Sequence, residues 1–214
     1  MSKNTILCMF SGGIDSSGVL HQLITDADYR DRQLVVHHIV LQNRENRAQA
    51  ELDSVAKIID YYQKNYSERP FIYTESIFNT SGFAPLSADR FPFDMDVCAF
   101  IAGNLAVARK DVRQIAMGRT KTDVASGGDN FRQRMERAQR IFKAVYCLEA
   151  ESAPNYIFPA INMSKKEIWQ MLPTPVQEES WYCRHPQYQS DGSAMPCKQC
   201  TTCKEVAKFL PYEE

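Results

Sequence analysis

The segment TILCMFSGGIDSSG, residues 5–18, places adjacent glycines and several serines where an apolar run ends. The run 6–10 predicts a buried strand, and apolar residues return at helical spacing from Val19 onward. Glycines at a strand-to-helix turn let the backbone approach an anion, and the N–H groups of a helix start create a positive, concave site. The segment therefore predicts a phosphate-binding loop.

Two common nucleotide loops do not fit this segment. A Walker loop would need a lysine after its second glycine, and a dinucleotide fingerprint would need the Gly-x-Gly-x-x-Gly spacing. The remaining alternative is an ordinary Gly-Gly turn in which Asp15 or Ser16 caps the following helix.

Four cysteines near the other end of the sequence have the spacing of a metal site. Cys197, Cys200 and Cys203 form C-x-x-C-x-x-C, and Cys183 lies a short loop upstream. Four thiolates complete a tetrahedron around Zn²⁺ and leave no open position, which favours a structural site. His185 is a second-choice ligand in place of Cys183, and an iron–sulfur cluster is the less favoured alternative.

Composition sets the broad class. The chain has 214 residues, a formal net charge of −1 and the apolar content of a globular protein, so one domain is expected, and direct nucleic-acid binding is not. No stretch has the length of a signal peptide core or a membrane span, so we expect a cytoplasmic protein without membrane contact.

Thiols stay reduced in the cytoplasm. The cysteines outside the cluster, Cys8, Cys98 and Cys147, are expected to be small core residues.

Expected strands alternate with expected helices along the chain. This alternation predicts an α/β fold with a parallel five-stranded sheet in the order 3-2-1-4-5 and helices on both faces, because parallel strands need crossover connections. We expect one α/β domain over residues 1–175 and a metal-binding segment of the same domain over 176–214. The strands are expected at 6–10, 33–41, 71–76, 114–118 and 156–161, and the helices at 48–66, 94–109, 130–147 and from 164.

The hexapeptide SGGIDS after the first strand resembles the PP-loop of the ATP pyrophosphatase family, which has an adenine nucleotide α-hydrolase-like fold. In that family the loop grips the β- and γ-phosphates of ATP while a substrate oxygen attacks the α-phosphate. The resemblance implies ATP and Mg²⁺ as cofactors and gives Asp15 and Ser16 catalytic roles. It places Ser11, Gly12, Gly13, Ile14, Asp15 and Ser16 in the nucleotide site.

An N-terminal PP-loop with a C-terminal four-cysteine site resembles the 7-cyano-7-deazaguanine synthase family of queuosine biosynthesis. SKKEIW at 164–169 and GRTKTD at 118–123 also resemble elements of that family. The resemblance implies a C–N bond-forming, ATP-dependent ligase that adenylates the carboxylate of 7-carboxy-7-deazaguanine. Ammonia then converts it through an amide to the nitrile. Gly118, Lys121 and Asp123, at the carboxyl edge of the sheet, are the further expected nucleotide-binding residues. Lys165, at a helix start that faces the same edge, is the expected catalytic cation, because a cation at a helix N-terminus is otherwise unfavourable.

The segments that would read the substrate depart from the family pattern. QNRENRAQAE (42–51), FPFDMD (91–96) and ASGGDNFRQR (125–134) stand where the family has other motifs, which leaves the acceptor open. The loop 81–94, with Phe83, Phe91 and Phe93, is the candidate for stacking a heterocycle or for packing on itself. Alternatives are a PP-loop tRNA sulfur transferase and a non-catalytic ATP-binding module. A homodimer remains open.

Overall fold

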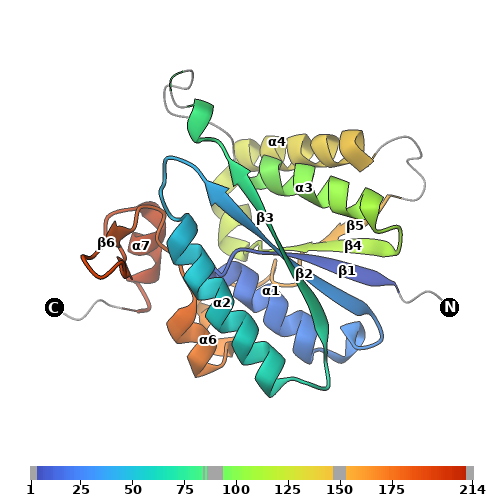
Figure 1. Ribbon diagram of the computed structural model, residues 1–214, viewed down its shortest axis with the longest axis horizontal. Helices are drawn as coiled ribbons and strands as arrows, with labels where there is room; N and C mark the ends of the chain where they lie inside the picture. Colours follow the sequence, from blue (N-terminus) through green and yellow to red (C-terminus); the bar gives the residue numbers. More distant parts are fainter. Residues whose placement is uncertain (1–3, 84, 86–93, 147–152, 211–214) are drawn as a thin grey trace.

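A computed structural model describes residues 4–83, 85, 94–146 and 153–210. Its core is a five-stranded sheet in the order β3-β2-β1-β4-β5 (Figure 1), and every neighbouring pair is parallel, which confirms the predicted topology. The strands are β1 (Thr5–Phe10), β2 (Gln33–Gln42), β3 (Phe71–Asn79), β4 (Val112–Met117) and β5 (Asn155–Ile157).

Position in the sheet explains the sequence of each strand. All six residues of β1 are buried, because β1 lies at the centre with strands on both sides and helices on both faces. β3 lies at an edge, none of its residues is fully buried, and exposed positions recur along it. Carboxyl ends of parallel strands meet at one edge of a sheet, and the loop after β1 therefore opens where ligands bind in such folds.

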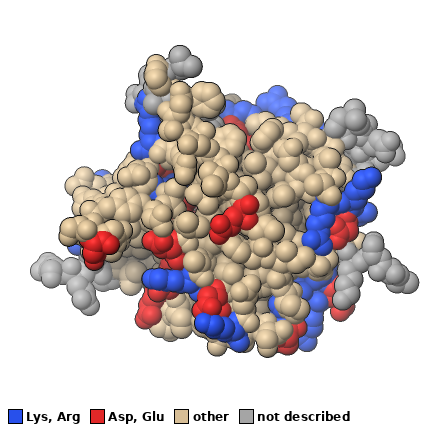
Figure 2. Space-filling view, in the orientation of Figure 1, with Lys and Arg blue, Asp and Glu red and all other residues tan. Residues whose placement is uncertain are grey.

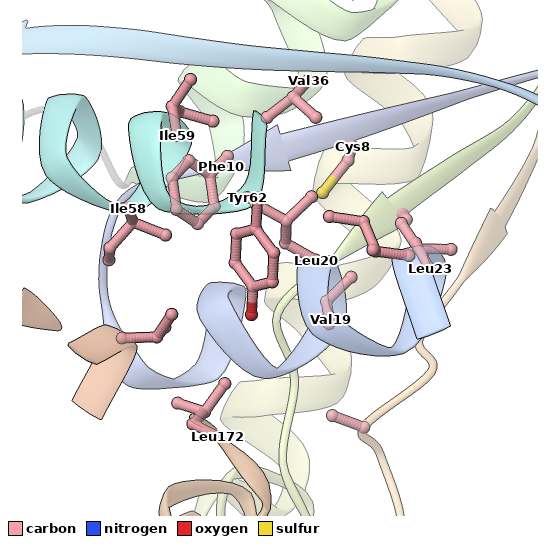
Figure 3. Close-up of a cluster of buried hydrophobic side chains, with 14 of the residues drawn as sticks. Cys8, Phe10, Val19, Leu20, Leu23, Val36, Ile58, Ile59, Tyr62 and Leu172 are labelled. Atoms are coloured by element: carbon pink, nitrogen blue, oxygen red, sulfur yellow. The ribbon is translucent and has the colours of Figure 1, made fainter. Parts of the chain in front are cut away.

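The two faces of the sheet carry separate apolar cores. On one face, α1 (Ile14–Thr25) and α2 (Ala48–Asn65) pack around Tyr62, which is fully buried (Figure 3). On the other face, α3 (Asp94–Ala108) and α4 (Lys121–Tyr146) pack around Phe142 (Figure 1). The apolar stripe expected in 48–66 is the buried face of α2.

Some boundaries differ from expectation for local reasons. β5 stops at Ile157, shortly before Pro159, which cannot donate a ladder hydrogen bond. The helix expected at 130–147 begins at Lys121, and its two parts meet at Gly128, where φ is 47°. Arg137, in the second part of this helix, forms an ion pair with Asp96 of α3 at 2.7 Å.

The C-terminal part of the chain forms a small unit beside the carboxyl edge of the sheet (Figure 1). It follows α5 (Lys165–Met171), which begins with a capping box formed by Ser164 and Glu167. An unexpected helix, α6 (Thr174–Glu179), leads into it. The unit itself contains an antiparallel pair, β6 (Gln187–Tyr188) and β7 (Ala194–Met195), and the short helix α7 (Thr201–Val206).

Two short 3₁₀ turns, η1 (Ala27–Tyr29) and η2 (Ser81–Phe83), complete the described elements. Among the described helices, none combines the length and apolarity needed to cross a bilayer. On the face seen in Figure 2, basic and acidic side chains are interspersed rather than gathered by sign.

Candidate ATP site and cysteine centre

The loop 11–16 is closed by the hydroxyl of Ser16. This hydroxyl donates to the carbonyl of Gly13 at 3.0 Å and accepts the N–H of Ser11 at 3.2 Å. The Oγ atoms of the two serines lie 3.0 Å apart. These contacts curl the backbone immediately after β1 and hold the loop in one shape before any ligand arrives.

The start of α1 carries no side-chain cap. Gly13 is the N-cap residue, and within the described residues no side-chain cap hydrogen bond is present, so neither Asp15 nor Ser16 serves as the cap considered from the sequence. Uncapped N–H groups at a helix start need an acceptor from elsewhere. With the adjacent glycines, they form the concave donor set that suits a phosphate.

Gly12 and Gly118 have no room for a side chain, because neighbouring segments approach their backbone closely. Gly12 has φ +73°, and a Cβ atom there would lie 2.9 Å from the Ser54 Oγ of α2. Gly118 follows β4, and a Cβ atom there would lie 2.9 Å from the backbone nitrogen of Ser16. Gly118 therefore lets the end of β4 pack directly against the loop after β1.

Lys165 reaches the loop from the first position of α5. Its Nζ lies 3.2 Å from Asp15 Oδ2 and 3.2 Å from Glu205 Oε2, and the residue is 8% exposed. Burial raises the pKa of Asp15, and the Lys165 ammonium opposes that rise. Burial alone would lower the pKa of Lys165, but the two carboxylates raise it, so the ammonium is charged at neutral pH.

Asp15 also offers an atom to a ligand. Its Oδ1 is shielded from solvent and accepts no hydrogen bond from the described part of the chain. A buried oxygen without a donor is costly unless a cation or ligand satisfies it. Carboxylate oxygens are preferred Mg²⁺ ligands, and the residues present therefore fit the magnesium that accompanies ATP.

A cavity of about 680 Å³ opens in front of the loop. The charged side chains of its lining include Asp15, Arg119, Asp123, Lys165, Lys204 and Glu205. The apolar side chains of its lining include Met9, Ile39, Leu41, Met95, Val97 and Met117. Cys98, expected in the core, is half-buried and also lines this cavity. The cavity therefore offers charged groups that suit phosphates and apolar groups that suit a flat ring system.

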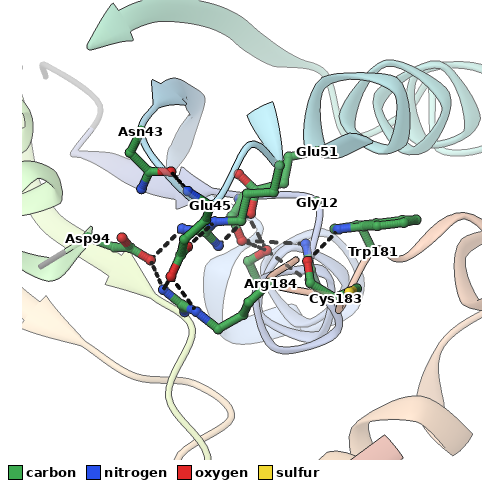
Figure 4. A network of polar contacts seen from close by, with 12 residues as sticks. Gly12, Asn43, Glu45, Glu51, Asp94, Trp181, Cys183 and Arg184 are labelled. Atoms are coloured by element: carbon green, nitrogen blue, oxygen red, sulfur yellow. Dashed lines mark hydrogen bonds and ion pairs between the residues drawn. The ribbon is translucent and has the colours of Figure 1, made fainter. Parts of the chain in front are cut away.

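An ion-pair network, drawn in Figure 4, adds further charged side chains to the lining of this cavity. Arg47 contacts Glu51 at 2.7 Å, Glu45 at 2.8 Å and, at shorter range, Asp94. Arg184 contacts Glu45 at 2.7 Å and Asp94 at 3.2 Å. Burial raises the pKa of Glu51 to about 7 although Arg47 opposes the rise, and the two arginines lower the pKa of Asp94 against its own burial.

No direct signal in the sequence indicates this network. Glu45, Arg47 and Glu51 lie within 42–51, and Asp94 lies within 91–96, two segments that depart from the family pattern. Arg184 belongs to the cysteine segment, and only the folded chain brings these residues together.

The remaining expected site residues occupy different positions. Ile14 lines the cavity. Asp123 lines it too, but its Oδ2 accepts the N–H of Thr120 at 3.0 Å. Lys121 has an exposed side chain and is not among the described residues that line the cavity. Of the three phenylalanines considered for stacking, Phe83 is 44% exposed, and Phe91 and Phe93 lie outside the described residues.

The four expected cysteine ligands meet in space. The Sγ atoms of Cys183, Cys197, Cys200 and Cys203 all lie within 4.8 Å of one another. Backbone N–H groups donate to three of these sulfurs: Cys197 to Cys183 at 3.2 Å, Cys200 to Cys197 at 3.3 Å, and Cys203 to Cys200 at 3.4 Å. Burial opposes ionisation, but the backbone donors Gln199 and Cys200 lower the pKa of Cys197 to about 6. Such a set fits a metal that binds thiolates.

The cysteine segment is attached to the phosphate loop. The N–H of Trp181 donates to the carbonyl of Gly12 at 2.9 Å, and Ser54 Oγ donates to the same carbonyl at 2.9 Å. Trp181 also pairs with Gly13 in a parallel bridge. The chain then reaches Cys183 two residues later, so the metal centre and the loop share one stretch of backbone.

A phosphate loop after β1, a buried lysine beside it and the 3-2-1-4-5 sheet define a member of the PP-loop ATP pyrophosphatase family, whose members use ATP. The sequence profile described as "Queuosine biosynthesis protein QueC" matches residues 96–210. The chain belongs to the QueC family.

Two solved structures are similar to this chain, and the first, with a TM-score above 0.5, has the same fold. The U34-tRNA thiolase NcsA from Methanococcus maripaludis, solved with its [4Fe-4S] cluster, has a TM-score of 0.52 and 14% identity, over 98% of this chain and 68% of that one. The NMN synthetase from Francisella tularensis has a TM-score of 0.42 and 12% identity, over 100% of this chain and 79% of that one. No curated protein sequence matches this chain.

Proposed function

We propose that the protein adenylates the carboxylate of 7-carboxy-7-deazaguanine and uses ammonia to form the amide and then 7-cyano-7-deazaguanine. The observation that carries this proposal is the buried contact between Lys165 and Asp15. This contact lies beside the phosphate-binding loop, where the start of α1 has no side-chain cap. QueC family membership supports the deazaguanine as the acceptor.

The charges around the loop suit departure of pyrophosphate. A carboxylate oxygen of the acceptor attacks the α-phosphorus, and the bond from that phosphorus to the bridging oxygen of pyrophosphate breaks. The N–H groups of 11–16 and the helix start receive the β- and γ-phosphates. Lys165 stabilises the charge that develops on the α-phosphate. Asp15 would hold the Mg²⁺, which neutralises the leaving group.

The acyl adenylate then reacts with ammonia. The nitrogen attacks the acyl carbon, AMP leaves with the carboxylate oxygen, and one proton passes to solvent to give the amide. The amide oxygen then attacks the α-phosphorus of a second ATP and pyrophosphate leaves. AMP departs with that oxygen, and the two protons of the amide nitrogen pass to solvent, which gives the nitrile. Apolar side chains in the cavity lining, Met95 and Met117 among them, support the placement of a flat base there.

The four cysteines are proposed to hold one Zn²⁺ in a closed, structural site. About 2.3 Å per Zn–S bond places tetrahedral sulfurs about 3.8 Å apart, close to the 3.9 Å between Cys197 and Cys203. A cluster of several irons spreads its ligands further. The NcsA structure carries such a cluster, so iron in this site would favour the sulfur-transfer alternative.

The test is a single incubation with ATP, Mg²⁺, 7-carboxy-7-deazaguanine and ammonia. We expect AMP and pyrophosphate, with the amide and the nitrile identified by mass. An amide that accumulates without nitrile would place the protein with a relative that stops one step earlier. Formation of ADP and phosphate, or no dependence on the base, would overturn the proposal.

A further inference from the structure

Lys165 has two carboxylate partners from different parts of the chain. Asp15 belongs to the phosphate loop, and Glu205 belongs to α7 in the cysteine segment. A cation at a helix start is disfavoured by the helix dipole, and an 8% exposed ammonium is disfavoured by burial. Both carboxylates are needed to offset these costs.

The demands on the two carboxylates differ when nucleotide binds. Asp15 has one oxygen on Lys165 and a second, buried oxygen without a donor that fits a magnesium ion. Sharing its charge with Mg²⁺ weakens its hold on the ammonium. Glu205 has no such second duty in the described contacts, so it is the partner that can fix Lys165 throughout the reaction.

The position of Glu205 is set by the cysteine centre. α7 begins directly after Cys200, contains the buried Cys203, and carries Glu205 two positions later. Its six residues are too few to be stable alone. Ligation of Cys200 and Cys203 fixes both the start and the buried side of the helix, and thereby the carboxylate.

We propose that Glu205 is a positioning residue that holds the Lys165 ammonium at the phosphate loop, and that the four-cysteine centre acts on the ATP site through this carboxylate. The kinetic part of this inference rests on the proposed adenylation. The positional part rests on the geometry alone.

The first experiment needs no acceptor substrate. Wild type, Glu205→Gln and Glu179→Gln, each with its metal bound, are treated with an amine-acylating reagent, and labelling of each lysine is followed by mass spectrometry. Glu179 is the matched control, because it also joins the C-terminal region to the α/β domain, through an exposed pair with Lys57 at 2.8 Å. Lys166, adjacent and exposed, is the internal standard.

Lys165 should be protected in wild type and in Glu179→Gln, and labelled at least about fivefold faster in Glu205→Gln, because a freed side chain is more accessible. Lys166 should react equally in all three. Metal content should match wild type, and the variant should remain folded. Equal protection of Lys165 in Glu205→Gln, or loss of its metal, would overturn the positioning role.

The second experiment is a double-mutant cycle on adenylation. Glu205→Gln should lower kcat about 10- to 100-fold with less than about a threefold change in KM for ATP, and Glu205→Asp should recover part of the loss. In a Lys165→Met background, Glu205→Gln should cost nothing further. Additive losses would overturn the inference. Faster labelling without any turnover of the base would instead count against the proposed function alone.

Discussion

The N–H of Trp181 donates to the carbonyl of Gly12 at 2.9 Å, so the segment that leads to Cys183 also holds the phosphate loop. A metal bound by Cys183, two residues downstream, would fix the backbone on which the loop rests. Trp181, Tyr182 and Cys183 line the cavity, so the cysteine segment is a wall of the candidate nucleotide site rather than a separate appendage.

Metal analysis should find one zinc per chain. Removal by a strong chelator should expose the backbone of 179–206 to hydrogen exchange, because the unit has little core of its own, and exchange at 11–16 should rise with it. Elemental analysis and exchange measured on the same sample provide the check. Iron in place of zinc, or an unchanged exchange pattern after metal removal, would contradict this prediction.

Asp15→Asn should abolish most turnover while the fold and the metal remain. The substitution keeps the shape but removes a charge that Lys165 and Mg²⁺ both use, and a loss of about 10²- to 10³-fold in kcat is expected. The measurement is pyrophosphate release. Asp60→Asn, which removes a carboxylate from an exposed pair with Lys64, should behave as wild type. Near-normal release from the Asp15 variant would remove this residue from the mechanism.

Gly118→Ala should disturb the phosphate loop. The added Cβ would lie 2.9 Å from the Ser16 nitrogen, so the loop or the end of β4 must shift, at a cost of about 1–3 kcal/mol. ATP affinity should fall together with the melting temperature. Gly82→Ala, where no atom lies within 4 Å of the new carbon, is the control. Equal effects at both positions would argue against close packing at Gly118.

Arg47→Met should be strongly destabilising. It leaves Glu51, only 7% exposed, and Asp94 without their shared guanidinium, and breaking such a buried pair costs about 3–5 kcal/mol. Urea unfolding at neutral pH is the measurement. Arg132→Met, which removes an exposed pair with Asp129, should change stability by about 0–1 kcal/mol. A small effect at Arg47 would show that the network is dispensable for folding.

Stability should fall on mild acidification because of His37. This side chain is 2% exposed, bonds Thr74 and Ser76, and burial lowers its pKa from 6.5 to about 4. Since the pKa in the folded state lies below that in the unfolded state, the full contribution is present above pH 6.5 and is lost progressively towards pH 4. Urea unfolding of wild type and His37→Gln at pH 7.5 and 5 should show a smaller acid-induced loss in the variant.

The sequence alone determined the parts that depend on short-range patterns. The alternating strands and helices, the sheet order and the phosphate loop could be predicted, because periodicity and the SGGIDS segment are local signals. The cysteine spacing likewise identified all four residues that gather at the metal centre.

Only the tertiary structure decided how these parts are joined. Arg184 and Glu45 are 139 positions apart, and no local pattern pairs them. No sequence pattern singled out Glu205 or Trp181. Their contacts with Lys165 and Gly12 form only because the C-terminal segment folds back on the edge of the sheet. Ion pairs and backbone bonds of this kind depend on chain packing, because charge and hydrogen bonding specify a partner only once two segments are already adjacent.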